Sequence, residues 1–209
     1  MIKNKLKLFI LLTTLLLLVI AFFAYFPRFW AESNYPLEYK DSIRKYATEF
    51  NVDPNFVAAV IYTESRFHPD SNSGAGARGL MQIMPATGAG LAQRLGLQFS
   101  PDMLFDPDYS IHLGTKYLRE QLDNYDGDID LVLASYNAGG GRATAWKLYG
   151  EALPKETIGF IAKVKNTKSM YDQIYGQWYN EMEVRKPNPF YVGITNIDSF
   201  VKGLFTGQR

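Results

Sequence analysis

The chain opens with a long apolar segment. Residues 8–26 form 19 positions without a charged side chain, bounded by Lys7 and Pro27. A helix rises about 1.5 Å per residue, so this segment nearly spans a hydrocarbon core of about 30 Å. Three lysines precede the segment, which favours a cytoplasmic amino terminus. We therefore predict a cytoplasmic stretch over residues 1–7, a transmembrane anchor over 8–26 and a linker over 27–38.

A cleaved signal peptide is the alternative interpretation of this segment. Its apolar part would be about 7–15 residues long and would end in an A-x-A-like site. The apolar segment here is longer, and Ala21 and Ala24 do not have the spacing of such a site. Under both interpretations the remainder of the chain is exported.

Beyond residue 38 the apolar positions recur at helical spacing. Asp53 followed by Pro54 is typical of a helix N-cap and first helical position. Residues 69–79 are rich in glycine and serine, which predicts a loop or short hairpin. We expect a mostly α-helical domain over residues 39–186 and a tail over 187–209. The predicted helices cover about residues 39–50, 54–67, 85–96, 107–124, 129–137, 142–149 and 156–180.

Composition and charge exclude several classes of protein. The 209 residues contain no cysteine, which excludes a disulfide framework, a thiolate zinc site and a cysteine nucleophile. Four of the 22 basic residues lie within residues 1–30, which leaves 18 against 21 acidic residues and a formal charge of −3. A nucleic-acid binder usually has a basic face, so this balance argues against nucleic acid as a partner.

One acidic residue interrupts an apolar helical stripe. Val57, Val60 and Ile61 occupy positions i, i+3 and i+4 of the second predicted helix, and Glu64 is at i+7. A carboxyl group on that stripe faces the interior or a cleft, where burial raises its pKa. A carboxylic acid that stays protonated near neutral pH can act as a general acid. The alternative is that the helix ends early and Glu64 lies at an exposed rim, where most glutamates are found.

Two further segments stand out. Residues 74–79 contain three glycines, which permit tight turns or a close approach of backbone to ligand, but they lack the phosphate-loop and Rossmann patterns. Residues 135–141 place Tyr136 and Asn137 before three consecutive glycines at the end of an apolar helix. Taken alone, a tyrosine at position 136 is more often a core residue with a hydrogen-bonded hydroxyl than a binding residue.

Taken together, five sequence blocks resemble the lytic transglycosylases of the soluble lytic transglycosylase type. They occur in the family's order over about residues 40–180. The blocks are ES at 64–65, GLMQIMPAT at 79–87, LFDP at 104–107, LGTKYL at 113–118 and ASYNAGGGR at 134–142, with Trp146 beyond them. The resemblance implies a lysozyme-like domain, similar to goose-type lysozymes, with a small loop or hairpin region. Together with residues 8–26, this gives a mostly α fold with one N-terminal transmembrane helix.

Three positions depart from the pattern of this family. Ser135 replaces the usual alanine before the Tyr-Asn pair, and Gly140 replaces a proline between the glycines. The later E-T-x-x-Y-V block has Phe160 in place of its tyrosine. This change removes a hydroxyl group from the expected groove but leaves Glu64 unchanged.

The resemblance also implies a substrate and a mechanism. The substrate would be peptidoglycan, and the bond cut would be the β-1,4 link from N-acetylmuramic acid to N-acetylglucosamine. Glu64 would act first as acid and then as base, and the product would carry a 1,6-anhydromuramoyl end. Ser65, Met81, Gln82, Tyr136 and Asn137 would bind or orient the substrate. No cofactor or metal is expected, because the matched blocks contain no cluster of metal ligands.

The sequence also predicts where the domain acts, and it leaves two alternative functions open. The domain would lie on the extracytoplasmic side of a bacterial membrane, with peptidoglycan strands as its partner, and the tail over 187–209 would be available to a cell-wall protein. A hydrolytic lysozyme-like muramidase is one alternative. A non-catalytic glycan-binding scaffold is the other, motivated by Phe160 and by the unassigned tail.

Overall fold

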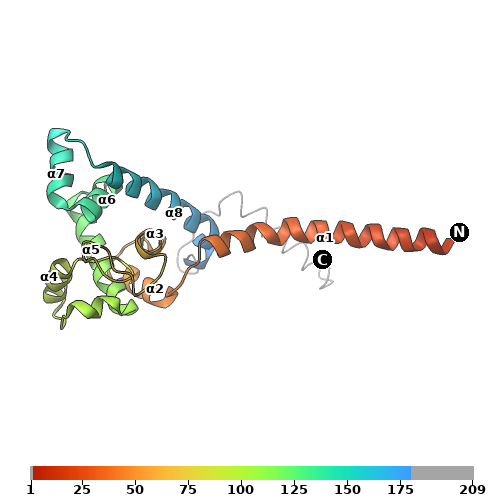
Figure 1. Cartoon of the computed structure of the whole chain (residues 1–209), viewed down its shortest axis with the longest axis horizontal. Coiled ribbons are helices and arrows are strands. Elements are labelled where there is room, and N and C mark those ends of the chain that lie inside the picture. The colour runs from red at the N-terminus through yellow and green to blue at the C-terminus, as the bar shows by residue number, and fades with distance from the viewer. Residues whose placement is uncertain (1, 180–209) are drawn as a thin grey trace. The chain divides into compact units, whose positions relative to one another are not determined.

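The structure is a computed structural model that describes residues 2–179 (Figure 1). The chain divides into two compact units, and residues Leu37–Tyr179 form one of them. The described part of the other unit consists of one long helix and the two residues that follow it. The predicted domain end at residue 186 and the tail over 187–209 lie outside the described residues.

Helix α1 covers Ile2–Asn34. Its part from Phe9 to Asn34 is long and apolar enough to cross a membrane, judged by length and composition. The helix extends beyond the anchor predicted over 8–26, so the first part of the predicted linker, residues 27–34, is helical. Proline is tolerated within membrane-type helices, and the Asn34 side chain closes the last turn by donating to the Trp30 carbonyl at 2.8 Å.

The second unit is mostly helical, as the sequence predicts. Among residues 37–179 there is no β-strand, and only two isolated bridges occur, between Asn72 and Arg78 and between Arg78 and Ile83. The loop predicted over 69–79 contains both partners of the first bridge. The helices are α2 (Lys40–Glu49), α3 (Pro54–Ser65), α4 (Pro85–Leu95), the short 3-10 helix η1 (Pro101–Phe105), α5 (Pro107–Asn124), α6 (Ile129–Ala138), α7 (Gly140–Tyr149) and α8 (Lys155–Tyr179).

Side-chain caps fix several of these helix starts. The Asp53 carboxylate accepts a hydrogen bond from the Asn55 amide at 2.8 Å at the start of α3. Asp106 caps α5 in the same way, and Asp128 caps α6. One boundary differs from the prediction: α7 begins at Gly140, not at residue 142, because only Gly139, with φ of 88°, interrupts the helical path after α6.

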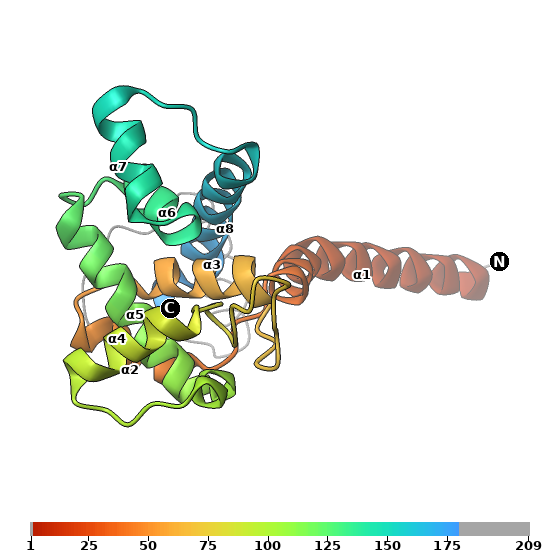
Figure 2. The same cartoon turned by 60° about the vertical axis from the view of Figure 1, so that its left-hand side comes forward.

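Helix α3 supplies much of the core of this unit. Val57, Val60 and Ile61 have no exposed surface, and α3 packs against α8 and α2 (Figure 2). Burying these side chains is favourable by about 1.5–3 kcal/mol each relative to exposure. The helix that carries Glu64 is therefore rigidly held along most of its length.

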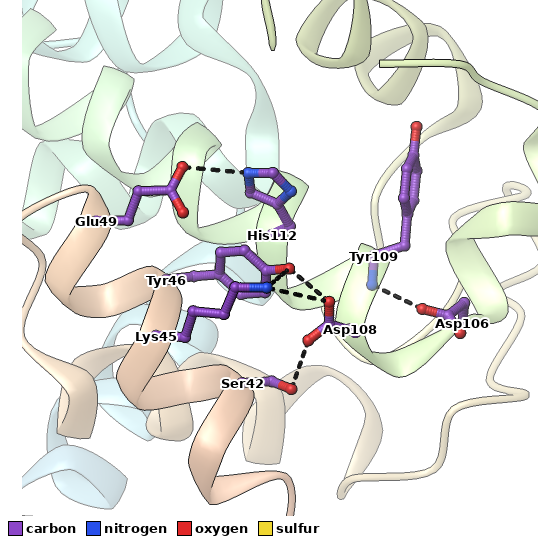
Figure 3. Close-up of polar contacts among 8 residues, drawn as sticks. All are labelled: Ser42, Lys45, Tyr46, Glu49, Asp106, Asp108, Tyr109 and His112. Atoms are coloured by element: carbon purple, nitrogen blue, oxygen red, sulfur yellow. Dashed lines mark hydrogen bonds and ion pairs between the residues drawn. The ribbon is translucent and has the colours of Figure 1, made fainter. Parts of the chain in front are cut away.

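A polar cluster joins α2 to the first turns of α5 (Figure 3). The Asp108 carboxylate accepts hydrogen bonds from the hydroxyl groups of Ser42 at 2.6 Å and Tyr46 at 2.5 Å. Burial raises the pKa of Asp108, but these two hydrogen bonds and the charge of Lys45 outweigh burial and hold the pKa below its usual value. The His112 ring stacks on the Tyr46 ring with centroids 4.2 Å apart. The cluster fixes the position of α2 against α5.

Candidate active site

Glu64 lies in the last turn of α3, where the chain leaves the core. The helix ends at Ser65, and Arg66 turns the backbone with a φ of 54°. The Glu64 side chain is half-buried. Burial raises the pKa of its carboxyl group to about 7, although the positive charge of Lys163 on α8 acts in the opposite direction. A substantial fraction of this group is therefore protonated at neutral pH.

Tyr136 is the titratable neighbour of Glu64 from α6. Its hydroxyl group donates a hydrogen bond to the Met81 carbonyl at 2.8 Å. Burial raises the pKa of Tyr136 well above its usual value, and the nearby Glu64 charge raises it further. The phenol stays protonated and connects α6 to the loop that precedes α4.

That loop is tied to the end of α3 by Ser65. The Ser65 hydroxyl donates to the Leu80 carbonyl at 2.8 Å and lies 3.2 Å from the Ile61 carbonyl. The side chain is only 7% exposed. The residue that follows Glu64 thus holds the backbone of the GLMQ block in place.

Gln82 braces the same loop from within. Its backbone has a φ of 47°, and its side-chain amide donates to the Ser71 carbonyl at 3.0 Å and to the Gly79 carbonyl at 2.9 Å. Gly79 also has a positive φ, 75°, and any side chain there would clash with the Leu104 carbonyl. The glycine at position 79 is required by both conformation and space.

Met81 lies beneath the loop. Its side chain has no exposed surface and packs directly on Gly114 of α5, where a side chain would clash with the Met81 sulfur. The Met81 backbone amide is 3.3 Å from the Ser110 hydroxyl oxygen. Its carbonyl is the group that accepts the Tyr136 hydrogen bond.

A cavity of about 280 Å³ opens between this loop, α4, α5 and α6. Three of the predicted site residues, Gln82, Tyr136 and Asn137, line it. Asn137 is also fixed from α8, because its side-chain oxygen accepts a hydrogen bond from the Thr157 hydroxyl at 2.9 Å. The full lining is Gln82, Ile83, Met84, Thr87, Tyr117, Tyr136, Asn137, Ala138 and Gly139.

Glu64, the predicted acid, is not among the residues that line the cavity and neighbours it through Tyr136. The predicted substrate-binding residues fall into two groups. Gln82, Tyr136 and Asn137 have atoms at the cavity, whereas the side chains of Ser65 and Met81 lie below its surface. The sequence did not single out Tyr117, Thr87 or Lys163. The first two lie in the quoted LGTKYL and GLMQIMPAT blocks, but the sequence assigned no role to these side chains.

A second cavity, of about 520 Å³, lies between α6, α7 and α8 and contains none of the predicted site residues. Trp146 and Ile158 are part of its mostly apolar lining. Within residues 2–179 no three histidine, aspartate or glutamate side chains come together as metal ligands.

Comparison with known proteins identifies the family to which the chain belongs. Residues 41–158, more than half of the chain, match the family described as Transglycosylase SLT domain. The soluble lytic murein transglycosylase of Escherichia coli K12 is 30% identical over 158 residues, and the transglycosylase of Enterobacteria phage PRD1 is 40% identical over 122. Membrane-bound lytic murein transglycosylase C of Serratia proteamaculans is 35% identical over 114 residues. In the same order, the three matches cover 69%, 58% and 50% of this chain. This chain spans only 24%, 42% and 32% of the length of the three relatives.

Solved structures show the same fold. The 70 kDa soluble lytic transglycosylase of Escherichia coli matches with a TM-score of 0.65 and 30% identity over 70% of this chain and 26% of its own. An inactive Glu-to-Gln variant of the lytic transglycosylase Slt from Pseudomonas aeruginosa matches with a TM-score of 0.64 and 28% identity, over 76% of this chain and 26% of its own. The chain belongs to the Transglycosylase SLT domain family.

Proposed function

We propose that residues 37–179 form a peptidoglycan lytic transglycosylase domain. It cleaves the β-1,4 bond between N-acetylmuramic acid and N-acetylglucosamine without consuming water. The proposal is supported by membership of the family and by relatives named lytic murein transglycosylases. The observation that carries it is a half-buried glutamate with a pKa of about 7 at the end of a core helix, next to the tyrosine that lines the cavity.

In the first step Glu64 is the general acid. Its carboxyl proton goes to the glycosidic oxygen as the bond from that oxygen to C1 of the muramoyl sugar breaks. Glycosidases usually need a second carboxylate at this stage. Neither Glu64 nor a second carboxylate is among the residues that line the described cavity, and Tyr136, which does line it, is the neighbour of Glu64. As the family resemblance implies, the acetamido oxygen of the muramoyl sugar attacks C1 in place of a protein nucleophile.

In the second step Glu64 is the general base. Its carboxylate takes the proton from the muramoyl C6 hydroxyl as that oxygen attacks C1 and displaces the acetamido oxygen. The product is a 1,6-anhydromuramoyl end, and Glu64 regains the proton that it lost. A pKa near 7 suits both steps, because the group must give and take a proton within one turnover.

The other site residues position these reactants. Tyr136, held by the Met81 carbonyl, orients the acid or the acetamido group. Gln82 and Asn137 face the sugar at the cavity while their hydrogen bonds to the protein fix their orientation. Ser65 and Met81 act from below, by holding the loop that carries Gln82.

We also propose that α1 anchors the domain to a bacterial membrane, with the domain on the extracytoplasmic side. The length and apolar composition of α1 support an anchor, and some relatives are named membrane-bound. Three lysines before the apolar segment support the orientation. Peptidoglycan is then within reach of the domain, and the tail over 187–209 would be available to a cell-wall protein.

The test is product analysis of digested peptidoglycan. The full chain in detergent should release muropeptides with anhydro ends, which are lighter than reducing ends by one water. Reducing ends alone would indicate a hydrolytic muramidase. Retained binding without any turnover would indicate a glycan-binding scaffold. The Glu64→Gln variant is the matched control, because it keeps the side-chain shape and removes the acid.

A further inference from the structure

A hydrogen bond from α8 fixes the amide group of Asn137 at the cavity. The Thr157 hydroxyl donates to the side-chain oxygen of Asn137 at 2.9 Å. Thr157 is only 2% exposed, whereas Asn137 is exposed and lines the cavity. The E-T-x-x-Y-V block reads ETIGFI here, so Thr157 carries the only hydroxyl group of the block in this chain. Because the Asn137 oxygen faces Thr157, the nitrogen of the same amide is directed away from Thr157.

The amide group of Gln82 is fixed in the opposite sense. Its nitrogen donates to the Ser71 carbonyl at 3.0 Å and to the Gly79 carbonyl at 2.9 Å. Carbonyl oxygens cannot donate, so the group that faces them must be the NH₂, and both of its hydrogens are used. The group that Gln82 can offer to a ligand is therefore its side-chain oxygen, which is a hydrogen-bond acceptor.

Tyr136 adds a second acceptor to the cavity. Its hydroxyl hydrogen goes to the Met81 carbonyl at 2.8 Å, so in this arrangement the phenol oxygen accepts from a ligand and does not donate. Of the three predicted binding residues at the cavity, Asn137 is the one whose hydrogen bonds among the described residues leave hydrogens to donate. One donor and two acceptors around one cavity match a secondary amide, which offers one carbonyl oxygen and one N–H group.

We propose that Thr157 is a positioning residue that turns the Asn137 nitrogen toward the cavity, where this nitrogen donates to an amide carbonyl on a substituent of the sugar. The proposal rests on the proposed function for the identity of the ligand, an amino-sugar polymer. Peptidoglycan carries such carbonyls in two places, the acetamido group and the lactyl group that bears the stem peptide. Without the Thr157 hydroxyl, the Asn137 amide is free to turn over and to place its oxygen against the ligand carbonyl, and two acceptors form no hydrogen bond.

The experiment measures the affinity of the full chain in detergent for purified insoluble peptidoglycan by co-sedimentation. All proteins carry Glu64→Gln, so that the ligand stays intact. Thr157→Val keeps the shape of the side chain without its hydroxyl and should raise Kd about three- to tenfold, the size expected for one lost hydrogen bond. Thr157→Ser restores the hydroxyl and should bind within about twofold of the parent.

Two further polymers identify the carbonyl that Asn137 binds. Chitosan, a glucosamine polymer, has neither carbonyl, so Thr157→Val and the parent should bind it equally well. De-N-acetylated peptidoglycan keeps only the lactyl carbonyl. Equal binding of Thr157→Val and the parent to this polymer assigns the contact to the acetamido group, and a retained difference assigns it to the lactyl group.

Thr115→Val is the matched control for the loss of a buried threonine hydroxyl. Thr115 is fully buried on α5, and its hydroxyl has no hydrogen-bond partner among the described residues. This variant should bind peptidoglycan as the parent does. An unchanged Kd of Thr157→Val for intact peptidoglycan, or an equal loss of affinity for chitosan, would overturn the proposal.

A second variant keeps the proposal testable if Thr157→Val does not fold. Asn137→Asp replaces the donating nitrogen by an oxygen and should raise Kd for intact peptidoglycan at least as much, so an unchanged Kd overturns the proposal. Product analysis of the wild type tests the proposed function separately, because the binding assay needs no turnover.

Discussion

At the scale of single residues, the Glu64 carboxyl group is shielded from water and has no close cationic partner among the described residues. No salt bridge to it occurs among residues 2–179, and the charge of Lys163 only partly offsets the effect of burial on its pKa. Such a group lowers the stability of the folded protein when it is ionised. Catalytic groups are often held in such unfavourable environments, since a perturbed pKa is what their chemistry needs.

The stability of the protein should therefore depend on the ionisation of Glu64. The pKa of Glu64 is about 7 in the folded state and near the ordinary glutamate value of 4.5 in the unfolded state. The folded state then binds more protons between these values, so the free energy of unfolding falls as pH rises from about 4.5 to about 7. Glu64→Gln should raise Tm at pH 8 and change it little at pH 4. An equal change of Tm at both pH values would contradict the raised pKa.

The sequence predicted the position of the acidic residue Glu64 but not the hydrogen bonds that hold the loop beside it. Helical spacing placed Glu64 on an apolar stripe, and the structure places it at the end of that helix. The hydrogen bonds of Ser65 and Gln82 to backbone carbonyls could not be predicted in this way. They depend on the positive φ of Gln82 and on a loop whose path is set by contacts distant in sequence.

At the scale of secondary-structure elements, the predicted helix starts agree with the structure where a capping residue marks them. The start of α3 was predicted because an aspartate and a proline mark it, and the structure has the same pair, Asp106 and Pro107, at the start of α5. The differences occur where the local signals are ambiguous. Three consecutive glycines predicted a longer break than the single residue Gly139 that makes it, and Pro27 predicted a helix end that α1 passes through.

The contact between α2 and α5 should depend on Asp108. Asp108→Asn weakens the hydrogen bonds from Ser42 and Tyr46, so we expect a loss of about 1 kcal/mol in the free energy of unfolding at pH 7. Because the folded state lowers the pKa of Asp108, this contribution is present above the usual aspartate pKa and is lost as pH falls below it. Urea unfolding at pH 7 and pH 3 measures both effects.

Asp102→Asn is the matched control for this variant, since Asp102 pairs with Arg78 while its side chain is 88% exposed. An exposed pair of this kind contributes little. A loss at pH 7 no larger for Asp108→Asn than for Asp102→Asn would argue against the cluster as the link between α2 and α5.

The packing of Met81 on Gly114 should couple α5 to the site. A methyl group at position 114 would clash with the Met81 side chain, so Gly114→Ala must displace the backbone whose carbonyl holds Tyr136. We expect a loss of about 1–3 kcal/mol in stability and a lower lytic rate per folded molecule. Gly159→Ala on α8 meets no atom within 4 Å and should leave both unchanged or stabilise the helix slightly. Equal stability and rate for the two variants would refute the coupling.

At the scale of the whole molecule, the chain joins an apolar helix to a compact helical unit of the transglycosylase family. The sequence predicted both parts, because a long uncharged segment and ordered family blocks are signals that need no tertiary information. It could not predict the cavity lining, which brings together side chains from three helices and a loop.

The anchor proposal predicts where the intact protein is found. The full chain should remain in the membrane fraction after extraction with alkaline carbonate, and its mass should include residues 1–26. Removal of residues 1–36 should release the helical unit into the soluble fraction. A mature protein that lacks the apolar segment would show cleavage and contradict the anchor.

The central claim is that Glu64 transfers a proton to the sugar bridge and recovers one from the same muramoyl sugar. The most direct measurement is mass analysis of peptidoglycan digested in water enriched in oxygen-18, with the wild type and Glu64→Gln side by side. The account predicts anhydro ends without incorporated label from the wild type and no release of muropeptides by Glu64→Gln. Labelled reducing ends from the wild type, or an unchanged rate for Glu64→Gln, would contradict it.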